Sequence, residues 1–75
     1  MNTITPGKYK HYKGGEYEVI GIGRIEVTME ECVIYKALYE TKDFPMGSLW
    51  VRTVAVFGED VETAEGIVPR FRRVS

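Results

Sequence analysis

Two consecutive glycines, Gly14 and Gly15, separate two runs that are rich in aromatic and β-branched residues. Because glycine accepts positive φ angles without steric cost, such a pair is typical of the two-residue turn of a β-hairpin. A two-residue turn also fixes the register, and it pairs opposite charges across this hairpin. We expect the cross-strand pairs Lys13–Glu16, Tyr12–Tyr17, His11–Glu18 and Lys10–Val19.

The rest of the chain continues this pattern of β-rich runs interrupted by glycine or proline, and no segment has a convincing helical period. Five strands are therefore predicted, over residues 8–13, 16–24, 31–39, 49–57 and 68–73. Gly21 and Gly23 lie inside the second strand, where glycine often marks a bulge or a sharp bend. The third strand is apolar on both faces, which indicates a central position in the sheet.

Alternation divides the fourth predicted strand into two faces. Leu49, Val51, Ala55 and Phe57 share one of them, which we expect to contribute to the core. Short, bent strands in a chain of 75 residues favour an all-β fold, a small antiparallel SH3-like barrel of about five strands. An OB-like barrel is less favoured, because the segment between the third and fourth strands contains proline and glycine and leaves no room for a helix. In SH3-like barrels the first and last strands commonly lie side by side.

The length of the chain predicts one domain over residues 7–75, preceded by a flexible arm over residues 1–6. A domain of this size buries only about 60% of its unfolded surface, so a homodimer would widen its stability margin. One cysteine and one histidine cannot form a structural zinc site, and we expect no metal and no cofactor. The lone cysteine, the absence of a signal-peptide pattern and the lack of a long apolar run indicate a cytoplasmic protein without membrane association.

The formal net charge of −1 and the pI near 5.8 argue against a generic nucleic-acid binder. The charge is unevenly distributed, however: residues 1–13 contain bases and no acid, residues 59–65 contain acids and no base, and residues 70–73 contain three arginines. If the first and last strands are neighbours, their bases approach one another. The acidic segment lacks the spacing of a regular cation-binding loop and is interpreted as a solvated loop.

His11 is the one side chain whose unperturbed pKa lies near neutrality. In the predicted register Glu18 would orient it, but no nucleophile accompanies the pair, which we interpret as a hairpin contact. Cys32 lies in an apolar run and is interpreted as a small buried hydrophobe. The Gly-Ile-Gly run at 21–23 lacks both the third glycine and the following helix of a phosphate-binding loop. We therefore predict no catalytic residues and a protein that is not an enzyme.

Aromatic and basic residues are interleaved near both ends of the chain. Exposed Tyr, Trp and Arg dominate binding hot spots, and aromatic rings also stack on the bases of single-stranded nucleic acid. The competing interpretation is that these rings fill a core too small to be sealed by aliphatic side chains. The predicted binding residues are Tyr12, Trp50, Arg52, Arg70, Phe71, Arg72 and Arg73.

Two kinds of partner fit this surface. We favour a protein or peptide, held on Trp50 and Tyr12 with Arg52 at the edge, because the overall charge is acidic and the hairpin charges are balanced. The alternative is weak binding of RNA or single-stranded DNA by the basic first and last strands. An enzyme or small-ligand domain that uses His11 ranks third.

Four sequence blocks, GKYKHYKGGEYEVIGIGR, VIYKALY, LWVR and VPRFRRV, occur in this order between Gly7 and Val74. With these blocks the chain resembles the small bacterial family known as domain of unknown function 1653. Its members usually have proline after the LWVR block, where this chain has Thr53. The resemblance implies an SH3-type barrel and no known activity.

Overall fold

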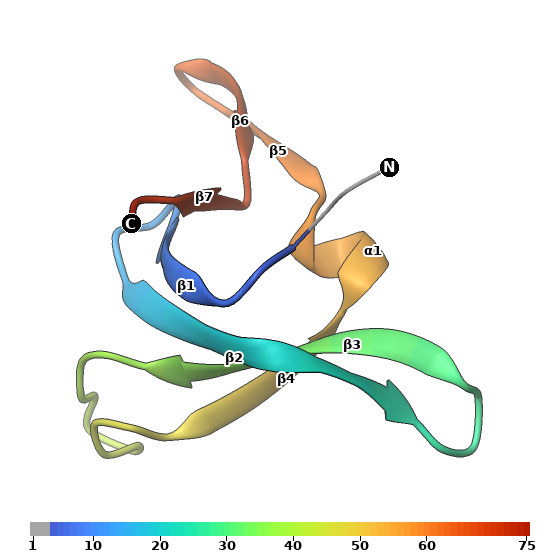
Figure 1. The fold of residues 1–75 in the computed structure, drawn as a ribbon. Coiled ribbons are helices and arrows are strands. Elements are labelled where there is room, and N and C mark those ends of the chain that lie inside the picture. The colour runs from blue at the N-terminus through green and yellow to red at the C-terminus, as the bar shows by residue number, and fades with distance from the viewer. Residues whose placement is uncertain (1–3) are drawn as a thin grey trace.

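The computed structural model describes residues 4–75, which form a mostly-β domain (Figure 1). Five strands make one antiparallel sheet in the order β4-β3-β2-β1-β7, and β5 and β6 form a separate two-stranded sheet. Within residues 4–75 the larger sheet does not close into a barrel, because β4 and β7 are its two edges. The elements are β1 (Gly7–His11), β2 (Glu16–Ile25), β3 (Glu30–Ala37), β4 (Leu49–Thr53), α1 (Val54–Phe57), β5 (Asp60–Thr63), β6 (Gly66–Pro69) and β7 (Phe71–Arg73).

The hairpin between β1 and β2 turns over three residues rather than the predicted two. The backbone N–H of His11 donates to the carbonyl of Gly15 at 2.8 Å, and the N–H of Gly14 donates to the carbonyl of His11 at 2.8 Å. Gly14 has a φ of 109°, whereas Gly15 is not among the residues with positive φ. A tight turn that is followed by one glycine in this region is the usual three-residue hairpin loop.

This longer loop shifts the register of the hairpin, so the predicted pairing of His11 with Glu18 is wrong. The observed pairs are Lys10–Glu16, Tyr9–Tyr17, Lys8–Glu18 and Gly7–Val19. Opposite charges still face each other, because lysine alternates along β1 as glutamate does along β2. The charge pattern alone therefore does not distinguish the two registers.

Three other expectations about the sheet are confirmed. The register between β2 and β3 shifts between Val19 and Gly21, which is the predicted bulge. β3 lies between β2 and β4, away from the sheet edges. β1 pairs with β7, and this pairing sets His11 opposite Phe71.

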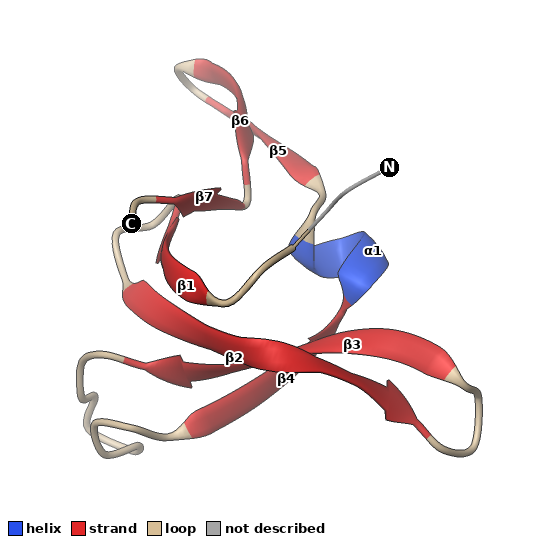
Figure 2. Ribbon diagram, viewed as in Figure 1, coloured by secondary structure: helices blue, strands red, loops and turns tan. Residues whose placement is uncertain are grey.

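The fourth strand ends at Thr53, and the helical turn α1 replaces the rest of the predicted strand (Figure 2). Thr53 caps this turn, because its Oγ1 accepts a hydrogen bond from the backbone N–H of Val56 at 3.3 Å. The turn buries Phe57, as predicted for that residue. Leu49 and Val51 are 63% and 58% exposed and Ala55 is exposed too, so the predicted place of these three residues in the core is wrong.

The acidic segment predicted as a solvated loop begins the hairpin of β5 and β6, which projects away from the five-stranded sheet (Figure 1). Gly66, with a φ of 114°, lies in its turn. The last predicted strand is divided at Arg70, between the end of β6 and the start of β7. Acidic side chains alternate with the others along β5. The segment was not predicted as a strand because of these acidic residues. Within residues 4–75, no three His, Cys, Asp or Glu side chains gather as a metal-ligand group.

Aromatic rings dominate the core. The rings of Phe57 and Phe71 stack with their centroids 4.1 Å apart and their planes within 5°. Cys32 is buried, as predicted. The central cluster of buried side chains consists of Tyr9, Val19, Val33, Tyr35, Phe57 and Phe71.

The arm predicted over residues 1–6 lies partly outside the described residues, which begin at residue 4. Ile4 packs against the core cluster. The hydroxyl of Tyr9 donates to the carbonyl of Thr5 at 3.0 Å. None of the helices in the described part of the chain has the length and apolar character that crossing a membrane requires.

Candidate functional site

A row of aromatic rings crosses the molecule because the strand order brings β7, β1, β2 and β3 together. From Tyr12 the row passes to His11 at 4.6 Å between ring centroids, and then to Phe71 at 4.9 Å. It continues to Tyr17 at 5.7 Å and to Tyr39 at 5.5 Å. We call these five residues the aromatic row. Its two ends, Tyr12 and Tyr39, are each 37% exposed.

One side of the aromatic row lines a pocket of about 380 Å³, which we call the tyrosine pocket. It contains three tyrosines and three side chains that carry or can accept a positive charge, and no carboxylate. Its volume is within the range of small-ligand sites. The lining residues are His11, Lys13, Gly15, Tyr17, Tyr35, Tyr39, Arg52 and Phe71.

Arg52, a predicted binding residue, reaches the tyrosine pocket from β4. Its Nε donates a hydrogen bond to the hydroxyl of Tyr35 at 3.0 Å. Its guanidinium carbon lies 5.8 Å from the ring centroid of Phe71, a distance suited to a cation–π contact. These two contacts hold the guanidinium at the pocket wall.

His11 faces both positive charge and aromatic rings. Burial is the main reason that its pKa lies below 6.5, and the nearby charges of Arg52, Arg70 and Lys13 lower this pKa further. The backbone N–H of Lys13 donates to Nδ1 at 3.1 Å, so the proton of the neutral ring is assigned to Nε2. Glu18, the predicted partner of His11, instead forms an ion pair with Lys36 at 3.5 Å.

The tyrosine hydroxyls of the pocket take part in two hydrogen bonds, one between Tyr17 and Tyr39 and one that Tyr35 accepts from Arg52. Those of Tyr17 and Tyr39 are 2.5 Å apart. Burial raises the pKa of Tyr17, and the hydrogen bond between Tyr17 and Tyr39 adds to this effect. Burial also raises the pKa of Tyr35, against the opposing influence of Arg52.

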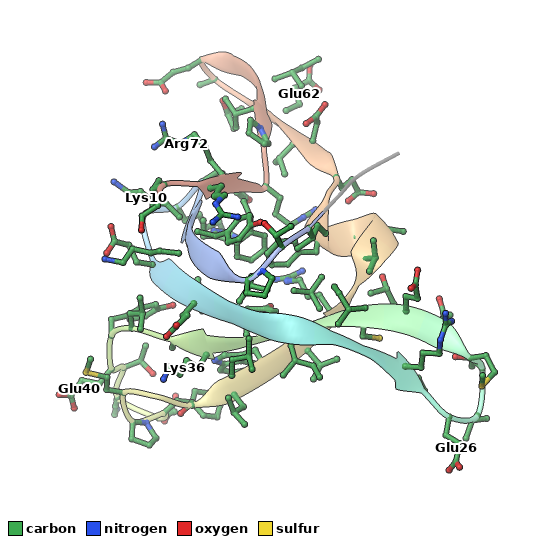
Figure 3. All side chains as sticks on the ribbon, viewed as in Figure 1. Lys10, Glu26, Lys36, Glu40, Glu62 and Arg72 are labelled. Atoms are coloured by element: carbon green, nitrogen blue, oxygen red, sulfur yellow. The ribbon has the colours of Figure 1, made fainter. Side chains whose placement is uncertain are left out.

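A second depression, of about 570 Å³, lies beside the β5–β6 hairpin, and we call it the hairpin groove. The predicted binding residues Tyr12 and Arg72 line it. Arg72 lies opposite Lys10 in the β1–β7 pair, and Figure 3 shows both side chains on the same side of the molecule. Unlike the tyrosine pocket, the hairpin groove includes a carboxylate, that of Glu65.

Two predicted binding arginines are engaged within the protein. Arg70 forms an ion pair with Glu59 at 2.9 Å. Arg73 donates from Nε to the carbonyl of Ser75 at 3.1 Å and from Nη1 to Thr5. Neither arginine lines the tyrosine pocket or the hairpin groove.

Trp50 also lies outside both depressions. Its ring meets that of Phe44 edge to face, with the centroids 4.9 Å apart. In the β3–β4 pair it is opposite Tyr35, and opposed residues of an antiparallel pair share a face of the sheet. Trp50 therefore extends the face that carries the tyrosine pocket, although it does not join Tyr12 as predicted.

The sequence pattern did not predict Tyr35 and Tyr39 as pocket residues, and it indicated only a hairpin contact for His11. The alternation of Tyr35, Ala37 and Tyr39 was a usable signal, because residues two apart in a strand point to one face. The alternation alone does not give the register between β2 and β3, which brings these rings close to Tyr17.

The chain is similar over most of its length to one family of proteins. The family model described as "Protein of unknown function (DUF1653)" matches residues 7–73. Among solved structures, the crystal structure of a DUF1653 protein from Bordetella bronchiseptica matches with a TM-score of 0.85 and 37% sequence identity. The match covers 95% of this chain and 87% of that one. No curated protein matches the chain at a significant level.

Proposed function

The chain belongs to the DUF1653 family, and we propose that it is a non-enzymatic binding module that holds a protein or peptide partner on the aromatic row and in the tyrosine pocket. The observation that carries this proposal is the continuity of the row, which ends in the solvent-accessible rings of Tyr12 and Tyr39. Aromatic side chains beside an arginine are the residue types that contribute most to protein interfaces. Arg52 supplies that arginine.

A peptide fits the geometry better than a strand of nucleic acid. Bases need free ring faces on which to stack. Here the ring of Tyr17 meets the rings of Tyr35, Tyr39 and Phe71 at angles between 75° and 81°. These edge-to-face contacts surround the ring of Tyr17 with other rings, whereas a side chain can enter the pocket that these rings line.

The surroundings of His11 support a non-enzymatic role. Its ring contacts are with Tyr12 and Phe71, and its Nδ1 is engaged by the backbone of Lys13. Neither a carboxylate that would orient the imidazole nor a serine, threonine or cysteine is among the residues that line the tyrosine pocket. General acid–base catalysis by histidine ordinarily relies on such neighbours.

We also propose that the five-stranded sheet is an open relative of the SH3-like barrel. The pairing of β1 with β7 and the bulge that bends β2 support this relationship. An experimental structure in which β1 and β7 are not neighbours would contradict it.

The function is tested by binding to immobilised peptides of random sequence, with the wild-type protein and two variants. Tyr39→Ala removes an exposed ring of the row, and we expect it to weaken peptide binding at least about tenfold, as for hot-spot residues. Val27→Ala is the control, because Val27 is exposed on the turn between β2 and β3. Equal peptide binding by the two variants would place the binding surface elsewhere.

The alternative function is weak RNA or single-stranded DNA binding, and Lys10 and Arg72 favour it. They lie opposite each other in the β1–β7 pair, and neither belongs to an ion pair of the described residues. If nucleic acid is the ligand, Arg72→Ala should weaken binding to mixed-sequence RNA at low salt and flatten its salt dependence, because fewer counterions are released. No binding to this RNA at low salt would exclude the alternative.

A further inference from the structure

We infer that the tyrosine pocket is a receptor for an anionic oxygen group, a carboxylate or a phosphate, carried by the peptide partner. This inference rests on the function proposed above and assigns a chemistry to its central site. Four features of the pocket carry it: the charges of its walls, the unpaired end of Arg52, the free hydrogen-bond donors, and the position of the lone histidine.

The charges of the pocket walls are all of one kind. Arg52 and Lys13 are cationic, His11 can become so, and no Asp or Glu belongs to the lining. The chain as a whole has eleven acidic and ten basic residues, Lys and Arg. A pocket without a carboxylate is therefore not a consequence of composition, and its field favours an anion.

The guanidinium of Arg52 is not paired with any carboxylate of the described residues. The ion pairs within residues 4–75 join Arg24 to Glu31, Lys36 to Glu18 and Arg70 to Glu59, and none includes Arg52. Its Nε is bound to Tyr35, while its two terminal nitrogens have no hydrogen-bond partner within the described chain.

These two nitrogens are also accessible to solvent. Among residues 4–75, the one side-chain N or O atom that is both buried and without a partner is Nε of Arg70. The terminal nitrogens of Arg52 are therefore not buried. The planar fork that they form matches the two oxygens of a carboxylate or of a phosphate.

Neutral donors complete the pocket. When the hydroxyls of Tyr17 and Tyr39 share a hydrogen bond, one proton lies between the oxygens, and the proton of the accepting hydroxyl remains available. His11 can donate from Nε2, because its Nδ1 accepts from Lys13. An oxyanion can thus receive hydrogen bonds from groups that face one pocket from different strands and the hairpin loop.

His11 makes the inference measurable, since it is the lone histidine of the chain. Burial lowers the pKa of His11 most, and the charges of Arg52 from β4, Arg70 between β6 and β7, and Lys13 from the hairpin loop lower it further. A bound anion opposes these charges. The pKa of His11 should therefore rise when the pocket is occupied.

The test follows the NMR signal of the His11 ring while inorganic phosphate, acetate or phenyl phosphate is added to the folded protein at constant ionic strength. We expect saturable shifts and a raised His11 pKa. Arg52→Gln should weaken this binding by about tenfold to a hundredfold, the range for hydrogen bonds to charged groups. Arg24→Gln is the matched control, because Arg24 is paired with Glu31 outside the pocket and should leave the titration unchanged.

Lys13→Gln gives a second variant in an exposed loop, so the test does not depend on the folding of the Arg52 variant. We expect it to weaken anion binding as well. Saturation by phosphate and phenyl phosphate but not acetate would assign a phosphorylated partner, and saturation by acetate as well would assign a carboxylate. Shifts that remain linear, or equal affinity in the wild type and both pocket variants, would overturn the inference.

The outcomes also separate this inference from the proposed function. Anion binding without any peptide binding would leave the anion site in place and remove the peptide partner. Peptide binding that depends on Tyr39 but is indifferent to acidic or phosphorylated residues would keep the binding module and remove the anion site.

Discussion

At the scale of single residues, Phe71 connects the core to the tyrosine pocket. Its ring is stacked on Phe57 and is only 8% exposed, yet it also lines the tyrosine pocket. The sequence predicted Phe71 as a binding residue and left a place in the core as the competing interpretation of its ring. The structure places this ring in the core cluster and at the pocket wall.

We predict that Phe71→Ala destabilises the protein by about 3–5 kcal/mol, because it removes a buried ring that the stacked partner cannot replace. This loss is comparable with the whole stability of a small domain, about 5–15 kcal/mol. Urea unfolding followed by the fluorescence of Trp50 measures the change. Arg72→Ala, at the next and exposed position, should stay within about 0.5 kcal/mol of the wild type. Equal urea midpoints for both variants would show that Phe71 is not a core residue.

A second prediction at this scale concerns pH. Because burial and neighbouring cations hold the pKa of His11 below 6.5 in the folded state, the unfolded chain binds more protons between the two values. The free energy of unfolding should therefore decrease as the pH falls from about 6.5 towards the folded pKa, and level off below it. Urea unfolding between about pH 7.5 and pH 5 measures this slope.

His11→Gln provides the comparison for the pH prediction, because it removes the imidazole and leaves every carboxylate in place. The difference between the two pH profiles isolates the contribution of His11. A wild-type profile that runs parallel to that of the variant through this pH range would contradict the lowered pKa.

At the scale of elements, the β1–β2 loop shapes the tyrosine pocket through two glycines with different roles. Gly14 takes the positive φ of the turn. Gly15 allows a close approach, since a Cβ atom built on it would lie 2.8 Å from the ring of Tyr39. The loop therefore determines where Tyr39 can lie.

Gly15→Ala should move Tyr39 away from Tyr17 while the fold persists, because the contact involves the outer end of a half-exposed side chain. We expect the free energy of unfolding to fall by about 0.5–1.5 kcal/mol, the contribution of one aromatic pair. Ligand binding should also weaken. Gly21→Ala is the matched control, since its Cβ would meet no atom within 4 Å. The ring NMR signals of Tyr17 report the displacement. Unchanged Tyr17 signals in Gly15→Ala would refute this role of the loop.

The sequence predicted elements well where local residues decide the structure. The first three strands, the bulge at Gly21 and the pairing of β1 with β7 follow from strand patterns, glycine placement and the expected fold. The helical turn α1 was missed because its β-branched residues favour a strand, whereas the cap at Thr53 and the burial of Phe57 outweigh that preference. The β5–β6 hairpin was missed because a run of acidic residues is more typical of a solvated loop than of a strand.

The candidate site was less predictable than the fold, because it depends on register. A loop of three residues instead of two sets Tyr17 opposite Tyr9 rather than Tyr12. An odd shift moves side chains to the other face of a strand. Residue types therefore predicted Arg52, which lines the tyrosine pocket, but not the tyrosines that surround it.

At the scale of the whole molecule, the homodimer expected from the small size of the domain stays a prediction, and β4 is where we expect it to form. β4 is an edge strand, and Leu49 and Val51 are exposed on it. Edge strands with apolar side chains tend to pair with other chains. Light scattering over a range of protein concentrations should show a dimer that Val51→Lys converts to a monomer. Val27→Lys, on an exposed turn, should not have this effect. A wild-type monomer at every concentration would contradict the prediction.

The pairing of β1 with β7 has a consequence for how fast the protein folds. β1, β2, β3 and β4 each pair with a sequence neighbour, so their contacts close short loops, whereas β1 and β7 lie far apart in sequence (Figure 1). The entropy cost of closing that long loop precedes the contacts that offset it. Because β7 carries Phe71, the stack with Phe57 stays incomplete until this closure. We therefore expect the arrival of β7 to limit the folding rate, with a meander of four strands forming before it.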